Sequence, residues 1–520
     1  MVDIRKFMQD NALRYLLVNS TNEYLVEYNT LEENSRYKLT NFSGSTGEAL
    51  VTPETIYLFV DGRYHIQADL EVDHSIVKVV KLQQGQKFVD ELIARIPENE
   101  TLGVFSKKVS QTRLEELLKN RSLRLLTVDP FDKKVPPERK KNVALDIKYT
   151  GFSVEDKIAK ITEKLQDDEA IYITDLDEVS YLFNMRNFSR NYSSKIIAKA
   201  LIFKDRYELF PRDKSIDLVQ ILSKIKQTVY IDKSSINAFD FRLLRNYAKE
   251  IKENPVKSMK AQKTPEEIEH LKEAFARTDN ALSAVRKYIE KNDNISEYDI
   301  SAKLEKEFKK NGAKCLSFAS IVAKDENSAL AHYSKSSKDE IIQDGSLVLI
   351  DCGAYFEGGL ATDITRVFVK GTPSGLHKRI YTMVLKAFLH AYNYGKVYKE
   401  RPLTGYNIAQ NTHKFFDGFK LDGFVFNHGL GHGIGVNVHE YPPNLSTSEM
   451  AKVPLLEGEC FSIEPGLYKE GFFGVRLENS CYFANDEIHS FSNMNYEKKL
   501  IDFDLLTDQE KGWLEEFEVK

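Results

Sequence analysis

Cysteine is scarce in this sequence. The 520 residues contain four, Cys315, Cys352, Cys460 and Cys481, and no two of them form a C-x-x-C pair. Without thiols at ligand spacing, the sequence does not indicate a cysteine-based metal site or a redox-active dithiol. Unpaired cysteines are ordinarily small, buried apolar residues of proteins from reducing compartments. We therefore interpret all four as buried core residues.

Long apolar runs, a leader-like N-terminus and a strong net charge are also missing. No apolar run approaches the roughly 20 residues of a membrane span. Asp3, Arg5 and Lys6 place charge where a signal peptide would have its apolar core. The net charge of −5 gives no basis for binding nucleic acid. We therefore expect a cytoplasmic protein with neither a membrane nor a nucleic-acid partner.

What is present is an ordinary globular composition, 42% hydrophobic and 29% charged, in a chain too long for a single core. Its length predicts about two to four domains. Two breaks divide it. Residues 129–137 are rich in proline and charge and predict a linker. Asn254-Pro255 forms the second break.

A helix start follows the second break. Thr264 is a suitable N-cap, Pro265 fits the first helical position, and Glu267 completes a capping box. The residues that then share one helical face are Ile268, Leu271, Ala274 and Phe275. This pattern predicts an amphipathic helix.

The first half of the chain contains a weak tandem repeat. The matching stretch is residues 12–42 in one copy and residues 170–184 in the other. Each copy predicts a helix, a buried strand and then a short helix with a polar cap. Both copies are typical of α/β domains.

Four acidic residues lie at the ends of separate apolar or β-rich runs in the last third of the chain. They are Asp351 after 347–350, Asp363 before 364–369, Glu464 after 460–463 and Glu478 after 474–477. Buried carboxylates repel one another unless they are paired or bind metal. A charge of about −4 is what two divalent cations offset. With His432, these residues form a donor set suited to a pair of cations that activates water.

The spacing of these residues predicts local geometry. Asp351 and Asp363 flank the turn at residues 357–359, which predicts facing positions on a β-hairpin. His428 and His432 have the spacing of a zincin helix, but glycines surround them and the glutamate of H-E-x-x-H is missing. We therefore predict a strand or loop there that brings its backbone close to a neighbour.

Larger motifs carry a resemblance to a known family. The site region reads D-C-G-A-Y-F-E-G-G-L-A-T-D-I-T-R, N-H-G-L-G-H-G-I-G-V-N-V-H-E, F-S-I-E-P-G and V-R-L-E-N. Elsewhere stand F-S-G-S-T-G, D-G-R-Y, L-D-E-V-S-Y-L-F-N-M-R, M-K-A-Q-K-T-P-E-E-I and L-T-D-Q-E-K-G-W-L. The C-terminal third resembles the pita-bread metallopeptidase superfamily. The whole chain is similar to the three-domain aminopeptidase P family.

The resemblance implies a mixed α/β (α+β) fold of three domains. Two tandem creatinase-like α/β domains would cover residues 1–133 and 143–253, and a pita-bread catalytic domain would cover residues 256–520. The implied activity is release of the N-terminal residue from peptides with proline second, by attack of a hydroxide that bridges two divalent cations. The implied metal is manganese, although the ligands alone also permit cobalt, iron or zinc. The implied assembly is a homodimer.

The resemblance also implies a role for each site residue. Asp351 and Asp363 would bind one cation, and Asp363, His432, Glu464 and Glu478 the other, with Asp363 and Glu478 bridging. Glu464 would also be the general base. The implied substrate residues are His332 on the substrate side, His439 at the scissile amide, His428 at the proline pocket and Arg476. Arg476 shares a strand face with Glu478, so the residues alone indicate a charge partner for that carboxylate.

Two alternatives and one departure remain open at this stage. The chain could be a prolidase restricted to Xaa-Pro dipeptides, or a non-catalytic pita-bread protein that binds peptides. The spacing from Asp351 to Asp363 is one residue longer than is usual in the superfamily. An extra residue in the Gly358-Gly359 turn would be tolerated, whereas one inside a strand would turn an aspartate to the wrong face.

Overall fold

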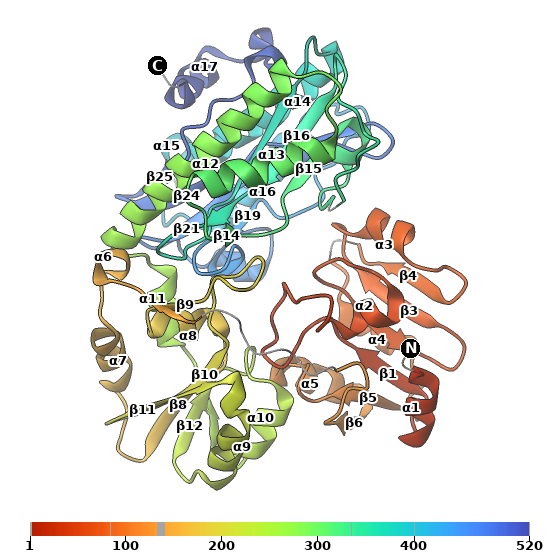
Figure 1. Cartoon of the computed structure of the whole chain (residues 1–520), viewed down its shortest axis with the longest axis vertical. Helices are drawn as coiled ribbons and strands as arrows, with labels where there is room; N and C mark the ends of the chain where they lie inside the picture. Colours follow the sequence, from red (N-terminus) through yellow and green to blue (C-terminus); the bar gives the residue numbers. More distant parts are fainter. Residues whose placement is uncertain (1–2, 84, 133–140, 334, 400, 519–520) are drawn as a thin grey trace. The chain divides into compact units, whose positions relative to one another are not determined.

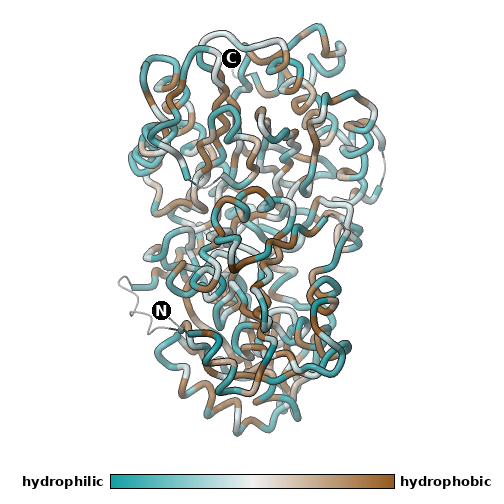
Figure 2. Tube along the Cα trace, turned by 90° about the vertical axis from the view of Figure 1, so that its right-hand side faces the viewer, coloured by the Kyte–Doolittle hydropathy of each residue, from teal (hydrophilic) through white to brown (hydrophobic). Residues whose placement is uncertain are grey.

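The computed structural model describes residues 3–83, 85–132, 141–333, 335–399 and 401–518 (Figure 1). The chain forms two compact units. Unit 1 comprises Met1–Arg139, Val154–Phe183 and Ile196–Asn254, and unit 2 comprises Lys140–Ser153, Asn184–Lys195 and Pro255–Lys520. Figure 2 shows short hydrophobic segments distributed along the trace of both units and separated by hydrophilic ones. The predicted mixture of helices and strands is confirmed.

Unit 1 contains two mixed sheets. The first has the order β4 (Val77–Lys81), β3 (Ile56–Val60), β2 (Glu48–Val51), β1 (Tyr15–Val18), β5 (Thr101–Phe105), β6 (Ser122–Leu126). Its helices are α1 (Ile4–Asp10), α2 (Ser35–Thr40), α3 (His65–Glu71), α4 (Phe88–Ile93) and α5 (Gln111–Leu118). Hydrophobic clusters occupy both faces, so the completely buried β1 reads as a continuous apolar run.

The second sheet has the order β11 (Tyr207–Pro211), β10 (Ala198–Phe203), β8 (Glu169–Ile173), β12 (Thr228–Ile231), β13 (Ala248–Glu250). Its helices are α7 (Val154–Thr162), α8 (Leu176–Leu182), α9 (Ser215–Lys224) and α10 (Ala238–Leu244). The predicted repeat is confirmed, because α1–β1–α2 and α7–β8–α8 have the same helix–strand–helix order, and Asn34 and Asp175 cap the two short helices.

Unit 2 holds several small sheets and the longest helices. Its strands are β7 (Val143–Ala144), β9 (Met185–Arg186), β14 (Cys315–Leu316), β15 (Ile321–Lys324), β16 (Leu347–Cys352), β17 (Ala354–Tyr355), β18 (Ile364–Val369), β19 (Gly431–Gly433), β20 (Glu440–Leu445), β21 (Cys460–Ile463), β22 (Gly466–Lys469), β23 (Phe473–Arg476), β24 (Asn479–Ala484) and β25 (Glu487–Ser490). Its helices are α6 (Ile147–Thr150), α11 (Pro255–Ala261), α12 (Pro265–Lys291), α13 (Glu297–Lys310), α14 (Gly375–Tyr392), α15 (Tyr394–Tyr398), α16 (Gly405–Asp417) and α17 (Asp508–Leu514).

Strand β16 lies between two hydrophobic clusters, in a sheet of order β15-β16-β18. Leu347 and Leu349 pack in the cluster that includes α14, while Val348 and Ile350 pack in the cluster that includes α12 and α13. Side chains alternate along a strand, so Asp351 continues the face of Leu347 and Leu349. The sheet therefore turns this aspartate toward β21 to β24, whose residues share that cluster.

The predicted helix start at Thr264 is confirmed. The Thr264 side chain accepts a hydrogen bond from the Glu267 N–H, and the Glu267 carboxylate accepts one from the Thr264 N–H. Leu271, Ala274 and Phe275 are buried and Ile268 is half-buried, as the amphipathic pattern predicts.

Part of the predicted linker belongs to the core of unit 1 instead. Phe131 is buried, and Asp129 forms a buried ion pair with Lys108 at 2.7 Å. Residues 133–137 of that prediction lie outside the described residues. Three of the four cysteines are buried as predicted, whereas Cys315 is half-buried. Within the described residues, no helix combines the length and the apolar character that crossing a bilayer requires.

Candidate metal centre

Two of the predicted ligands lie on a β-hairpin formed by β16 and β18. These strands are antiparallel, and Asp351 stands opposite Thr365, while Asp363 immediately precedes β18. The hairpin was predicted, but the prediction of directly facing aspartates was wrong. Alternation places Asp351, Thr365 and Asp363 on one face, so the two aspartates are diagonal neighbours.

The turn of this hairpin is wider than a simple one. Strand β17 leaves β16 to pair with β14, and Tyr355 then bridges Ala361. Gly359 has a φ of 65°, a conformation that favours glycine, and its N–H donates to the Phe356 carbonyl. Because of this excursion, the number of residues between Asp351 and Asp363 does not give the register in which β16 and β18 pair.

His432 lies on β19, which is flanked by β20 and β21. A Cβ on Gly431 would come within 1.9 Å of the Ser462 carbonyl oxygen, so this position requires glycine. The predicted close backbone approach is thus confirmed. The His432 Nδ1 lies 3.1 Å from the Gly433 carbonyl oxygen, which can only accept. Nδ1 therefore carries the proton, and the lone pair of Nε2 is directed elsewhere.

The Nε2 atom of His432 is directed at carboxylates. It lies 3.3 Å from Glu464 Oε1 and 3.6 Å from Asp363 Oδ2. Glu464 directly follows β21, and Glu478 joins β23 to β24. The Thr365 hydroxyl donates to Glu478 Oε2 at 2.7 Å, which fixes that carboxylate beside the hairpin. Asp363, His432 and Glu478 each offer one ligand atom, and these atoms lie within 4.8 Å of one another.

Two observations indicate that this arrangement of side chains fits divalent cations. Among the described residues, Asp351 Oδ1 and Glu478 Oε1 are buried and have no hydrogen-bond partner. Such atoms are costly unless a ligand satisfies them. In addition, a neutral histidine that donates from Nδ1 to a backbone carbonyl and faces carboxylates with Nε2 is the usual arrangement of a metal-binding imidazole.

The electrostatics of the cluster support the same conclusion. The pKa of Asp363 is raised well above its ordinary value, mainly by burial and then by the neighbouring charges of Glu478, Asp351 and Glu464. Burial, followed by Glu464 and Asp351, does the same for the pKa of Glu478. Burial also raises the pKa of Glu464 to about 7, although Arg476 opposes the shift. The protein therefore holds a concentration of negative charge that bound cations would offset.

Arg476 lies beside this cluster, with a partner that the sequence did not indicate. Its Nη2 donates to Asp351 Oδ2 at 2.6 Å, so among the described residues Arg476 forms its ion pair with Asp351 and not with Glu478. Its Nη1 donates to the Tyr468 hydroxyl at 2.8 Å and to the Ala331 carbonyl at 3.3 Å. The alternation of side chains along a strand correctly predicted the face on which Arg476 lies. Which carboxylate Arg476 contacts depends on the register of the hairpin.

Tyr468 is a site residue that sequence reasoning missed. Its hydroxyl lies 2.9 Å from His428 Nε2, while His428 Nδ1 lies 2.8 Å from the Gly429 carbonyl oxygen and so carries the proton. The Tyr468 hydroxyl thus accepts from Arg476 and donates to His428. Burial raises the pKa of Tyr468 to about 12, so it stays a donor. The Gly-Leu-Tyr sequence of β22 has no feature that would have identified it.

The remaining predicted residues lie in two loops. The His439 ring is 4.3 Å from the His432 ring, edge to face, and His439 is one of the groups that limit the rise in the pKa of Glu464 caused by burial. His332 follows the 3-10 segment Asp325–Ala329, and the neighbouring Ala331 carbonyl accepts from Arg476. The structure thus brings His439 directly to the acidic cluster and connects the His332 loop to it through Arg476.

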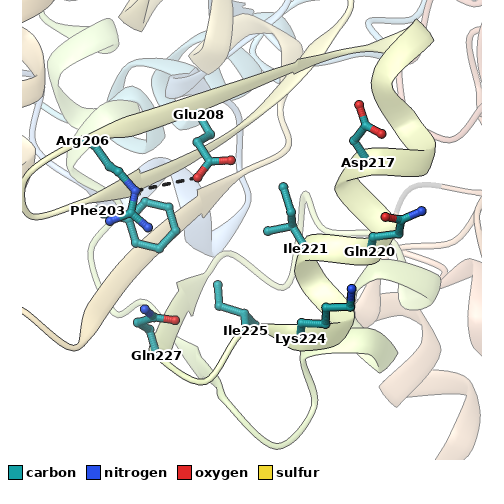
Figure 3. Close-up of a pocket in the computed structure, with 9 residues that line it drawn as sticks. All are labelled: Phe203, Arg206, Glu208, Asp217, Gln220, Ile221, Lys224, Ile225 and Gln227. Atoms are coloured by element: carbon teal, nitrogen blue, oxygen red, sulfur yellow. Dashed lines mark ion pairs between the residues drawn. The ribbon is translucent and has the colours of Figure 1, made fainter.

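The pocket in Figure 3 contains none of these residues. It lies in unit 1, where the β10–β11 hairpin contributes Phe203, Arg206 and Glu208, and α9 contributes residues such as Ile221 and Lys224. Arg206 and Glu208 form an ion pair across its rim at 3.8 Å. Its exposed mixed charges do not indicate catalysis.

Comparisons with known proteins agree with the geometry. A sequence model of metallopeptidase family M24 matches residues 269–484, and models of the creatinase/prolidase N-terminal domain match residues 2–132 and 133–267. The chain therefore combines an M24 metallopeptidase domain with two creatinase/prolidase N-terminal domains that precede it.

Individual relatives are similar over almost the whole chain. A probable Xaa-Pro aminopeptidase P of Laccaria bicolor is 29% identical, with 99% of this chain and 88% of the relative covered. Xaa-Pro aminopeptidase 1 of Dictyostelium discoideum is 27% identical, with 99% and 91% covered. The crystal structure of X-prolyl aminopeptidase from Caenorhabditis elegans, described as a cytosolic enzyme with a di-nuclear active site, superposes with a TM-score of 0.86. That pair is 22% identical, with 97% of this chain and 90% of the other covered, which shows a common fold.

Proposed function

We propose that this chain is an Xaa-Pro aminopeptidase, a metal-dependent hydrolase that releases the N-terminal residue from peptides with proline second. The observation that supports hydrolase activity is the convergence of Asp363, His432 and Glu478 on one point. Asp351 and Glu464 lie beside them. The proline preference rests on the relatives, which are named for it and are covered over most of their length.

We propose two divalent cations at this centre, with manganese as the metal. Asp351, Asp363 and Glu478 would hold one, and Asp363, His432, Glu464 and Glu478 the other. When bound, the cations supply Lewis acidity that lowers the pKa of water and polarises the scissile carbonyl. The di-nuclear site named for the Caenorhabditis elegans protein supports this proposal.

The chain's own side chains would handle the protons and the substrate. Glu464, which also belongs to the ligand set, would accept a proton from water and return it to the leaving amine. His439, at the edge of the cluster, would hydrogen-bond the scissile amide and stabilise the developing oxyanion. His428, oriented by Tyr468, would line the proline pocket, and His332 would face the substrate. Arg476 holds Asp351 and Tyr468 in place and would also bind the substrate.

An Xaa-Pro bond requires a dedicated site because it is a tertiary amide without an N–H and with a rigid ring. The test is product analysis by mass spectrometry after manganese loading. We expect Arg-Pro-Pro to lose arginine and Ala-Ala-Ala to remain intact. Cleavage of Ala-Pro but not of Arg-Pro-Pro would identify a prolidase instead. Binding of Arg-Pro-Pro without any cleavage would identify a non-catalytic peptide-binding protein.

Three further properties belong to this proposal. The domain division is residues 1–133, 143–253 and 256–520, supported by the three matched ranges. The protein would be cytoplasmic, and the description of the Caenorhabditis elegans enzyme as cytosolic supports this location. It would also form a homodimer. Cell fractionation tests the location, and sedimentation equilibrium tests the assembly, where a single species near 59.8 kDa would refute the dimer.

A further inference from the structure

A buried charge cluster lies directly beside His439 and has no part in the chemistry described so far. Glu440 is completely buried, and its Oε2 lies 3.0 Å from Lys260 Nζ and 3.1 Å from Lys263 Nζ. Both lysines are buried as well, one at the end of α11 and the other just before α12. Burying three charges is unfavourable unless they are closely paired.

The Glu440 carboxylate fills the inside of the loop that presents His439. This loop leaves β19 at Gly433 and returns at Glu440, and these two residues are paired across the sheet. The Asn437 N–H donates to Glu440 Oε1 at 3.2 Å. A Cβ on Gly435 would come within 2.5 Å of Glu440 Oε2, so the loop backbone rests against the carboxylate. The Gly435 N–H in turn donates to the Asn437 carbonyl at 3.0 Å.

The same loop is tied to the metal hairpin. The Ala361 N–H, two residues before Asp363, donates to the Gly435 carbonyl at 2.7 Å. The Ser194 hydroxyl donates to the Val436 carbonyl at 3.3 Å. The loop therefore has fixed contacts at its start and middle, and Glu440 fixes its end next to His439.

We propose that Glu440, held by Lys260 and Lys263, is a positioning residue that fixes the His439 ring against the scissile amide. This inference rests on the proposed function, in which His439 stabilises the transition state. The low pKa of Glu440, about 2 because the two lysines outweigh the effect of burial, keeps the carboxylate charged across the working pH range. A misplacement of about 1 Å in a catalytic group lowers the rate by up to about 100-fold.

The test changes the cluster without changing its net charge, and Lys263 stays in place in both variants. Lys260→Met combined with Glu440→Gln removes one charge of each sign, and Gly435→Ala displaces the carboxylate while leaving every charge in place. The matched control is Lys386→Met with Glu510→Gln. Glu510 is also buried, has a pKa lowered to about 2, and pairs with Lys386 at 3.1 Å in the same unit, and neither residue is part of the candidate metal centre.

We expect both test variants to lower kcat on Arg-Pro-Pro by about 10- to 100-fold with metal content unchanged, and the control to keep its kcat. In a His439→Ala background, the same changes should cost less than about twofold, because residues that act through one group are not additive. An equal loss in both backgrounds, or loss of metal, would overturn the positioning role.

A second measurement does not depend on activity. In zinc-loaded, histidine-labelled protein, the ring resonance that disappears in His439→Ala identifies His439. We expect this resonance to shift or broaden in both test variants and to stay in place in the control. An unchanged resonance would overturn the proposal. If the wild-type protein failed to cleave Arg-Pro-Pro, the proposed function would fail, while this spectrum would still test the positioning of the ring.

Discussion

Removing the metals should reverse the way in which stability depends on pH. In the metal-free protein, Glu464 has a pKa of about 7, above its ordinary value of 4.5, and the pKa values of Asp363 and Glu478 are raised as well. A carboxyl group with a raised pKa binds a proton in the folded state that it has lost in the unfolded state. The folded state is therefore favoured at low pH, and stability is lost as the pH rises from about 4.5 through about 7.

Glu464 alone allows the magnitude to be worked out. Its window spans about two and a half pH units, and each unit is equivalent to about 1.4 kcal/mol, so its ionisation should cost about 3 to 4 kcal/mol of folding free energy. Bound cations change the sign, because ligands must lose their protons before they bind metal. The loaded protein should gain stability over the same pH range.

The assay is thermal unfolding from pH 5 to 8, with and without manganese, on the wild type and on Glu464→Gln. The neutral amide removes one titrating group, so the metal-free variant should lose stability less steeply. Glu459, with a pKa of about 7, acts in the same direction, and His270, with a pKa of about 4, opposes it, but both remain in the variant and cancel in the comparison. A metal-free protein that gains stability as the pH rises, or equal slopes in the two proteins, would refute the reasoning.

Further predictions concern activity. Chelation should abolish hydrolysis and manganese should restore it, and full activity at a metal content near zero would contradict the two-cation site. Glu464→Gln should lower kcat by orders of magnitude, measured in steady state at saturating manganese, because both the base and a ligand are altered. His439→Ala should keep its metals, checked by elemental analysis, and lose on the order of 10²-fold in kcat/KM. Arg476→Met should destabilise the metal-free protein by about 3–5 kcal/mol, measured by denaturant unfolding, because it leaves Asp351 buried without its ion pair. Arg476→Lys, which keeps the charge, should lose less.

Local patterns in the sequence predicted local structure well. The capping box at Thr264 and the close backbone approach at Gly431 are confirmed, because a cap and a backbone contact depend on a few neighbouring residues. The order of acidic residues at strand ends also indicated a metal centre, and the structure places Asp363, His432 and Glu478 together. Their roles as ligands remain part of the proposed function.

Partners that depend on register or on distant segments could not be predicted. The excursion of β17 shifts the hairpin, and this shift decides that Arg476 meets Asp351. Tyr468 reaches the site through its hydroxyl from a strand whose sequence is unremarkable in pattern. Nothing in the sequence near Glu440 indicates its buried ion pairs, because its two lysines lie almost 180 residues earlier in the chain.

The division of the chain between the two units has a consequence for its synthesis. Lys140–Ser153 and Asn184–Lys195 are made with the first half but belong to unit 2. The Ser194 hydroxyl and the Arg186 side chain both donate to the Gly359 carbonyl, and Ser194 also donates to Val436. On the ribosome, Asn184–Lys195 must wait for more than 150 residues before Gly359 emerges, and Thr150 waits for 114 residues before Thr264 does. A fragment beginning at Pro255 would lack them, so the metallopeptidase unit cannot be obtained intact by a single cut in the gene.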